Sequence, residues 1–156
     1  MSMTSGVQTG TEKGVAESTS GENLRIVEQF VADVWNSRDV ELARQLLSPE
    51  YRVRFYGLPE KGYDDYFEYF PHQLETWPDL KVTIHHMFAD GEWVAVRYTW
   101  TATHAREAFG IPPTGNVVPG GGIATYRVTG GKIVEAWVCE DMLSTLGAMG
   151  AGPGGA

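Results

Sequence analysis

The feature that most constrains the fold is a change of hydrophobic period part-way along the chain. Between residues 22 and 76, apolar side chains recur every three or four positions, the spacing of an amphipathic helix. From Leu80 to Asp141 they recur at every second position, the spacing of a strand that buries one face. Helices followed by a run of strands predict an α+β fold, in which helices pack on one face of a curved antiparallel sheet.

The helical half of the sequence predicts three helices and one short strand. The first helix covers residues 22–38, the second follows an N-cap at Asp39, and the third covers residues 63–76. The strand lies between the second and third helices and is indicated by the alternating residues Tyr51, Val53 and Phe55.

The strand half predicts two hairpins, with turns at Asp90-Gly91 and Gly130-Gly131. Residues 103–122 join the hairpins and contain the sequence GIPPTG and three consecutive glycines. Those glycines lack the Lys and Ser or Thr of a phosphate-binding loop, so we interpret the segment as a connection between strands. Alternation places one set of residues on the buried face of the first hairpin: Val82, Ile84, His86, Val94, Val96, Tyr98, Trp100 and His104.

Length and composition predict one domain between two tails. A chain of 156 residues is enough for a single domain with a substantial core. Residues 1–21 are rich in Ser, Thr and Gly, residues 148–156 read AMGAGPGGA, and both segments are poor in large apolar side chains, so we expect both to be disordered. The working domain is therefore predicted to span residues 22–147.

The net charge of −8, with 12 Lys and Arg against 20 Asp and Glu, disfavours nucleic acid and anionic membranes as partners. The single cysteine, Cys139, excludes an intramolecular disulfide and a four-cysteine metal site. No apolar run approaches the roughly 20 residues that span a bilayer, and the N-terminus lacks the layout of a signal peptide. We expect a cytoplasmic protein.

Two histidines are candidates for proton transfer to a ligand. Alternation places His104 on the same face as Tyr98 and Trp100, where an imidazole could donate or accept a proton near neutral pH. The alternative is a strand-end histidine that bonds to neighbouring backbone. His86 could point into the same space, or could be an ordinary core histidine. Adjacent His85 and His86 would face opposite ways, and the sequence contains no HExxH, so we expect no metal site.

Three carboxylates lie in the last strand, between residues 132 and 141. Glu135, Trp137 and Asp141 share one face, and Glu140 shares the other face with apolar neighbours. Burial in an apolar pocket raises the pKa of a carboxyl group and makes it a usable acid or base near neutral pH. We expect Glu140 to face water, whereas Asp141 could equally face a pocket or water.

Two motifs resemble those of the SnoaL-like polyketide cyclases, a family of the nuclear-transport-factor-2-like superfamily. The first is THxxExxGIPPTG from Thr103, and the second is GKIVExW from Gly131, with Asp141 four residues past the tryptophan. The resemblance covers residues 22–147. It implies a cone-shaped α+β barrel, with a curved sheet wrapped around the N-terminal helices and a deep apolar pocket, and a homodimer formed through the sheet.

The family resemblance also implies a reaction, which is cofactor-independent ring closure of a polyketide by intramolecular aldol condensation. Residue by residue, it assigns Asp141 as the base and His104 as the donor to the enolate, with Glu135 as a second candidate base. The expected pocket residues are Tyr98, Trp100, Trp137, His86, Tyr51 and Phe55. Relatives carry ligand-facing side chains where the glycines stand, so we expect Gly121 to widen the pocket or to let a substrate approach the backbone.

Two alternatives stay open at this level. The same fold could catalyse epoxide opening, pyran closure or cofactor-free hydroxylation of a bulky hydrophobic intermediate in natural-product or antibiotic biosynthesis. It could also be a non-catalytic protein that binds a small molecule, because fold alone does not determine function.

Overall fold

The computed structural model describes residues 10–151, and side chains from residue 19 onward. The helical half contains α1 (Gly10–Glu28), the π-helical η1 (Gln29–Val34), α2 (Trp35–Ser37), α3 (Val40–Leu46), the strands β1 (Leu47–Phe55) and β2 (Lys61–Gly62), and α4 (Tyr63–Thr76). The strand half contains β3 (Lys81–Asp90), β4 (Trp93–Thr103), β5 (Val117–Thr129) and β6 (Lys132–Glu140), followed by α5 (Met142–Ala148).

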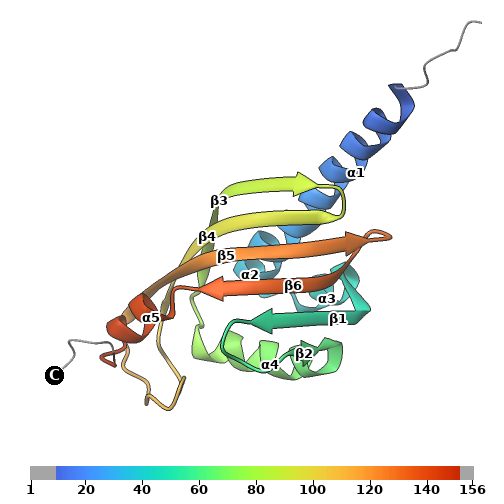
Figure 1. Cartoon of the computed structure of the whole chain (residues 1–156). Coiled ribbons are helices and arrows are strands. Elements are labelled where there is room, and N and C mark those ends of the chain that lie inside the picture. Colours follow the sequence, from blue (N-terminus) through green and yellow to red (C-terminus); the bar gives the residue numbers. More distant parts are fainter. Residues whose placement is uncertain (1–9, 152–156) are drawn as a thin grey trace, which may run out of the picture.

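The strands form one curved, open sheet in the order β2-β1-β6-β5-β4-β3 (Figure 1). The helices α2, α3 and α4 cover one face, and α5 lies at the end where β6 finishes. One continuous core joins the inner face of the sheet to η1, α3 and α4. The α+β class is thus confirmed, with one difference: β1 pairs with β6 in parallel, so the sheet is mixed and not purely antiparallel.

The predicted helices are confirmed. Residues 22–37 are helical through α1, η1 and α2, and Arg38 ends this run in a left-handed conformation. Asp39 caps α3 by accepting the backbone N–H of Leu42 at 2.9 Å. The apolar stripe of α4 is buried, and the helix continues through Pro71. The six-residue π-helical turn was not foreseen; it presents Phe30 and Val31 to the core.

Helical structure extends into both of the segments that the sequence predicts to be tails. α1 begins at Gly10, because lengthening an existing helix is far easier than nucleating one, and residues 1–9 lie outside the described part of the chain. At the other end, Met149 is only 3% exposed and packs with Trp77, Ala102 and Val118. Residues 152–156 also lie outside the described part. Among the helices described, none is long and apolar enough to cross a membrane.

A β-bulge in β3 overturns one part of the predicted alternation. The pairing of β3 with β4 shifts register between Ile84 and His86, and the extra residue reverses the faces that follow. His86 and Phe88 therefore lie on the outer face, where their rings stack, while Met87 is partly buried against the core. The prediction that His86 points inward is wrong for this reason.

The three glycines lie inside a strand and not in a connection. β5 starts at Val117, and Gly120, Gly121 and Gly122 stand opposite Trp100, Thr99 and Tyr98 of β4. The loop that precedes β5 is correspondingly shorter than the sequence suggested.

Candidate functional site

A largely apolar cavity of about 640 Å³ lies between the inner face of the sheet and the helices. Side chains of η1, β1, α4, β4, β5, β6 and α5 line it, together with the loops after β1 and β4. Aromatic rings dominate its wall: Phe30, Trp35, Tyr51, Phe55, Tyr56, Tyr66, Tyr69, Trp77, Tyr98, Trp100, Phe109 and Tyr126. An enclosure of this kind suits a bulky, hydrophobic and largely planar ligand.

Glu140 places a carboxylate in this cavity. It lies on the inner face because it follows Ala136 and Val138 at two-residue spacing, and both of those are buried. The Tyr98 hydroxyl donates to Oε1 of Glu140, and the Trp100 indole Nε1–H donates to Oε2 at 3.3 Å. Two residues on the inner face of β4 therefore hold the carboxylate in one orientation inside a largely apolar cavity.

The tyrosines near Glu140 remain neutral hydrogen-bond donors. Burial, reinforced by the negative charge of Glu140, raises the pKa values of Tyr98, Tyr69 and Tyr126 well above the usual range of a phenol. These hydroxyls therefore keep their protons throughout the physiological pH range. The charge of the Glu140 carboxylate contributes to the raised pKa of each of these three tyrosines.

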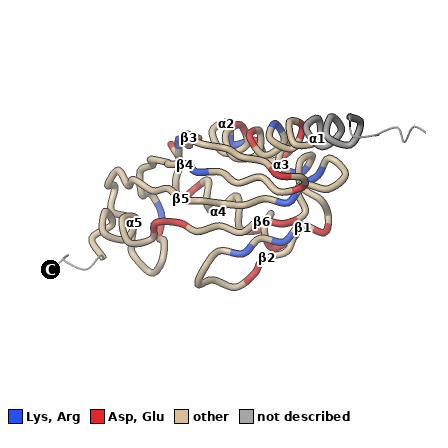
Figure 2. The backbone as a smooth tube through the Cα atoms, turned by 45° about the horizontal axis from the view of Figure 1, so that its top comes forward, with Lys and Arg blue, Asp and Glu red and all other residues tan. Residues whose placement is uncertain are grey.

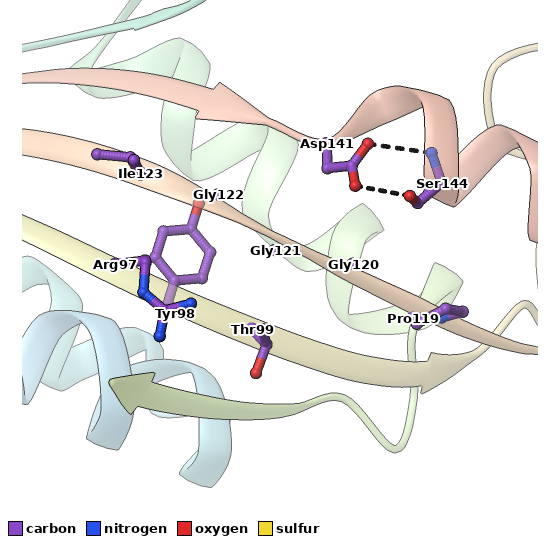
Figure 3. A pocket seen from close by; sticks show the side chains of 10 residues that line it. All are labelled: Arg97, Tyr98, Thr99, Pro119, Gly120, Gly121, Gly122, Ile123, Asp141 and Ser144. Atoms are coloured by element: carbon purple, nitrogen blue, oxygen red, sulfur yellow. Dashed lines mark hydrogen bonds between the residues drawn. The ribbon is translucent and has the colours of Figure 1, made fainter. Parts of the chain in front are cut away.

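Asp141, the first candidate base, does not line this cavity. It follows the end of β6 and caps α5, where its carboxylate accepts the backbone N–H of Ser144 at 3.1 Å and the Ser144 hydroxyl at 2.6 Å (Figure 3). The hydrogen bonds from Ser144 lower the pKa of Asp141, which is the opposite of the shift expected of a base in an apolar pocket. Its position supports a helix-capping role.

Glu135, the second candidate base, lies on the outer face of the sheet. Its carboxylate accepts hydrogen bonds from Trp137 Nε1 at 2.9 Å, Arg54 at 3.1 Å and Arg127 at 3.2 Å. The Trp137 indole, assisted by the two arginines, lowers the pKa of Glu135. Figure 2 shows acidic and basic positions close together along β1, β2 and β6, where this network lies.

Trp137 belongs to that outer network as well. The Arg54 guanidinium lies 4.6 Å from the centre of its ring, and the side chain is 37% exposed. The prediction that Trp137 lines the pocket is therefore wrong, because odd-numbered positions of this part of β6 face outward.

His104 is fully buried beside the cavity without lining it. Its Nδ1 accepts the backbone N–H of Thr114 at 3.3 Å and lies 3.1 Å from the Thr114 hydroxyl. An accepting Nδ1 leaves the proton on Nε2, which has no partner among the described residues. The ring packs against Trp77 at 5.4 Å between centres. These contacts fasten the GIPPTG loop to the end of β4 and support the alternative reading of a histidine bonded to backbone.

Gly121 faces away from the cavity, so its predicted role in widening the pocket is wrong. A Cβ at Gly121 would lie 2.7 Å from the Tyr98 carbonyl oxygen, and one at Gly120 would overlap the Trp100 indole. The glycines thus allow close strand pairing and leave room for Trp100. On the outer face they form the floor of a separate furrow of about 400 Å³, edged by Arg97, Ile123 and Ser144 (Figure 3).

The cavity brings together four of the predicted binding residues, Tyr98, Trp100, Tyr51 and Phe55. It lacks Asp141, His104, Glu135, Trp137, His86 and Gly121. Sequence reasoning missed Glu140, Tyr66, Tyr69 and Tyr126. The alternation of β6 did place Glu140 on the buried face, and that signal could have identified it. Among the described residues, no three His, Cys, Asp or Glu side chains are grouped to hold a metal ion.

The fold is an α+β cone, and its cavity contains one half-buried carboxylate, that of Glu140. The model of the SnoaL-like polyketide cyclase family matches residues 25–149, and the chain belongs to this family. Among curated protein sequences, none matches this chain.

Three solved structures illustrate the similarity. AclR of Streptomyces galilaeus, provisionally described as a hydroxylase, is 28% identical with a TM-score of 0.77, covering 86% of this chain and 88% of AclR. A SnoaL-like cyclase candidate from Jannaschia sp. CCS1 is 21% identical with a TM-score of 0.78, covering 86% and 96% of the two chains. IdmH of Streptomyces antibioticus, another cyclase candidate, is 24% identical with a TM-score of 0.71, covering 82% and 98%. The latter two likenesses concern the fold alone.

Proposed function

We propose that this protein is a cofactor-independent cyclase that closes a ring in a polyketide or related polycarbonyl intermediate, with Glu140 as its acid–base group. The observation that carries the proposal is the orientation of a single carboxylate by Tyr98 and Trp100 inside an aromatic cavity. Membership of the SnoaL-like family supports the substrate class.

The proposed step is an intramolecular aldol addition. Glu140 removes a proton from a carbon that lies between two carbonyl groups, and the electron pair left on that carbon forms a bond to a ketone carbon of the same molecule. The ketone oxygen then takes up the proton that Glu140 holds, so the product is an isomer of the substrate. The cavity contributes by holding the chain folded and by excluding water from the enolate.

The charge of the cavity favours an uncharged substrate. Glu140 and Glu107 both line it, whereas none of the lining residues is Lys, Arg or His. A substrate carboxylate or phosphate would therefore enter a site of like charge without a cation to pair with it.

The test is turnover of polycarbonyl substrates by wild type and by Glu140→Gln. Wild type should give a ring-closed product that is an isomer of the substrate, detected by chromatography and mass spectrometry. Glu140→Gln should bind the same substrates and lose ring closure. Full activity of Glu140→Gln would remove Glu140 from the mechanism.

A second candidate, hydroxylation of a bulky aromatic intermediate, is favoured by the similarity to AclR. The two candidate reactions differ in their consumption of oxygen. Hydroxylation with molecular oxygen consumes oxygen during turnover and adds one oxygen atom to the product, whereas aldol closure does neither. An oxygen electrode and the product mass decide between them.

We also propose that the protein forms a homodimer through the outer face of its sheet. Phe88, Trp93 and Ile123 on that face are 68%, 41% and 56% exposed, which is a large apolar exposure for a sheet surface. Sedimentation analysis of wild type and Ile123→Glu is the test. A wild-type protein that sediments as a monomer would contradict the proposal.

A further inference from the structure

Three tyrosine hydroxyls on the cavity wall take no part in the proton transfer proposed above. They belong to Tyr51, Tyr66 and Tyr126, each at most 6% exposed. The Tyr66 hydroxyl is buried with no partner among the described residues. Buried polar groups are nearly always paired, so this donor needs an explanation, and the hydroxyls of Tyr51 and Tyr126 lie close enough to interact with it.

The three rings surround a single phenyl group. The Phe30 ring centre lies 6.4 Å from that of Tyr51, 6.2 Å from that of Tyr66 and 5.9 Å from that of Tyr126. Phe30 comes from the π-helical η1, and the tyrosines come from β1, α4 and β5. π-helical turns are rare and are frequently found at functional sites. Four elements that are distant in sequence thus bring three tyrosine rings together around Phe30.

Burial keeps these hydroxyls protonated. It raises the pKa of each tyrosine, and the proximity of Tyr51 and Tyr126 raises the pKa of Tyr66 further. A cluster of neutral phenols offers donors to a ligand and suits an acceptor oxygen. Glu140 offers the opposite, because a carboxylate can only accept hydrogen bonds.

The tyrosine cluster and Glu140 lie at different depths. The backbone of Tyr126 pairs with Ala136 on β6, four residues before Glu140. The cavity wall is exposed to solvent nearer Glu140: Tyr56 bonds to the Val138 carbonyl at 3.1 Å, and Tyr56 and Leu58 are 68% and 52% exposed. The cluster is therefore the inner end of the cavity.

We propose that the hydroxyls of Tyr51, Tyr66 and Tyr126 form a second polar subsite, which binds a carbonyl oxygen at the leading end of the substrate. The ligand class is an elongated, apolar molecule that carries an acceptor oxygen at the end opposite the carbon presented to Glu140. Donors at the inner end and an acceptor near the mouth fix the direction in which the molecule enters, and hence which carbon reaches Glu140. Only the identity of that carbon rests on the proposed function.

The experiment compares two probes that differ only in an acceptor. 2-Acetylnaphthalene carries a carbonyl oxygen, and 2-isopropylnaphthalene is its hydrocarbon analogue of similar shape. Dissociation constants are measured by quenching of tryptophan fluorescence on the full-length protein. Wild type should bind the ketone about tenfold more tightly than the hydrocarbon, as expected for a buried hydrogen bond. The triple variant Tyr51→Phe/Tyr66→Phe/Tyr126→Phe should bind both probes equally.

Two controls make the result decisive. Tyr63→Phe removes a hydroxyl from the same helix as Tyr66 at a position that does not line the cavity, and it should keep the tenfold preference. Glu140→Gln should also keep it, so failure of the proposed function leaves this test intact. Tyr66→Phe should melt no lower than wild type, because the Tyr66 hydroxyl has no partner to lose among the described residues.

Each contrary outcome overturns the subsite. These outcomes are a ketone preference that survives in the triple variant, no preference in wild type, no binding of either probe, or a lower melting temperature of Tyr66→Phe. The single variants Tyr51→Phe and Tyr66→Phe repeat the comparison with less perturbation of the core.

Discussion

Carboxylates lie on both faces of the sheet but have different partners on each, and adjacent residues illustrate the contrast. Glu140 projects into the cavity and is held by Tyr98 and Trp100. Asp141, one residue later, lies outside the cavity and caps α5. Glu135 on the outer face is neutralised by two arginines and an indole.

The difference shows what makes a carboxylate available for chemistry. On the outer face, cations and helix-terminal N–H groups stabilise the charged form, so these carboxylates stay ionised and serve the structure. On the inner face, the partners are neutral donors that orient the group and leave it accessible to a ligand. The following predictions test this contrast, from the largest expected effect to the smallest.

Glu140→Gln should lower kcat by about 10²- to 10⁴-fold, the usual contribution of a positioned acid–base group. Asp141→Asn should leave kcat nearly unchanged, because Asp141 does not line the cavity. The measurement is steady-state formation of the ring-closed product. If Asp141→Asn lowered kcat more than Glu140→Gln did, the base would lie outside the cavity, and the contrast between the two faces would be wrong.

Gly120→Ala should lower the free energy of unfolding by about 3 kcal/mol, the upper part of the range for overpacking. The added methyl group would overlap the Trp100 indole and push it away from Trp77 and Glu140. Urea denaturation followed by fluorescence gives the value. Thr101→Val on the exposed outer face is the matched control, with an expected change within about 0.5 kcal/mol.

Tyr98→Phe should cost about 2 kcal/mol of stability, since it removes a hydrogen bond to a charged group while keeping the ring. It should also weaken turnover, because Glu140 would keep only the longer bond from Trp100. A variant as stable as wild type would mean that Glu140 does not depend on Tyr98 for its position. Thermal unfolding monitored by circular dichroism tests this.

Glu135→Gln should cost below about 1 kcal/mol at pH 7, as is typical of surface ion pairs. The folded-state pKa of Glu135 is lowered, so its charged form stabilises the fold above the unfolded-state value of about 4.3. That contribution is lost as the pH falls through the lowered folded-state pKa. The difference in the free energy of unfolding between wild type and Glu135→Gln should therefore disappear at acidic pH. Denaturation at several pH values measures this difference. A difference independent of pH would show that the carboxylate charge is not responsible.

Local patterns in the sequence were sufficient for most of the secondary structure. The spacing of apolar residues predicted α4 at its observed bounds, and the cap at Asp39 and the turn at Asp90-Gly91 were both confirmed. These features depend on a few neighbouring residues and on the period of a helix or strand, so they can be read without tertiary contacts. The same alternation correctly placed Tyr98 and Trp100 on the inner face.

The errors arose where pairing between strands overrides local pattern. A one-residue bulge after Ile84 turned His86 outward, and no local signal announces such a bulge. The role of Gly120 is clear only when Trp100 lies across it. Burial of Glu140 was visible in the alternation of β6, yet a charged residue at a strand end normally faces water, and only its neutral partners on β4 reverse that expectation.

The sequence by itself therefore determined the α+β class, the order of its elements and the apolar faces that must be buried, because these follow from the period and identity of consecutive residues. Tertiary structure alone decided which side chains hold the Glu140 carboxylate, how His104 is enclosed and which tyrosines pack around Phe30. Those outcomes depend on contacts between separate elements, such as Tyr98 with Glu140 and Phe30 with Tyr126, which strand register and packing control and which leave no mark in a local pattern.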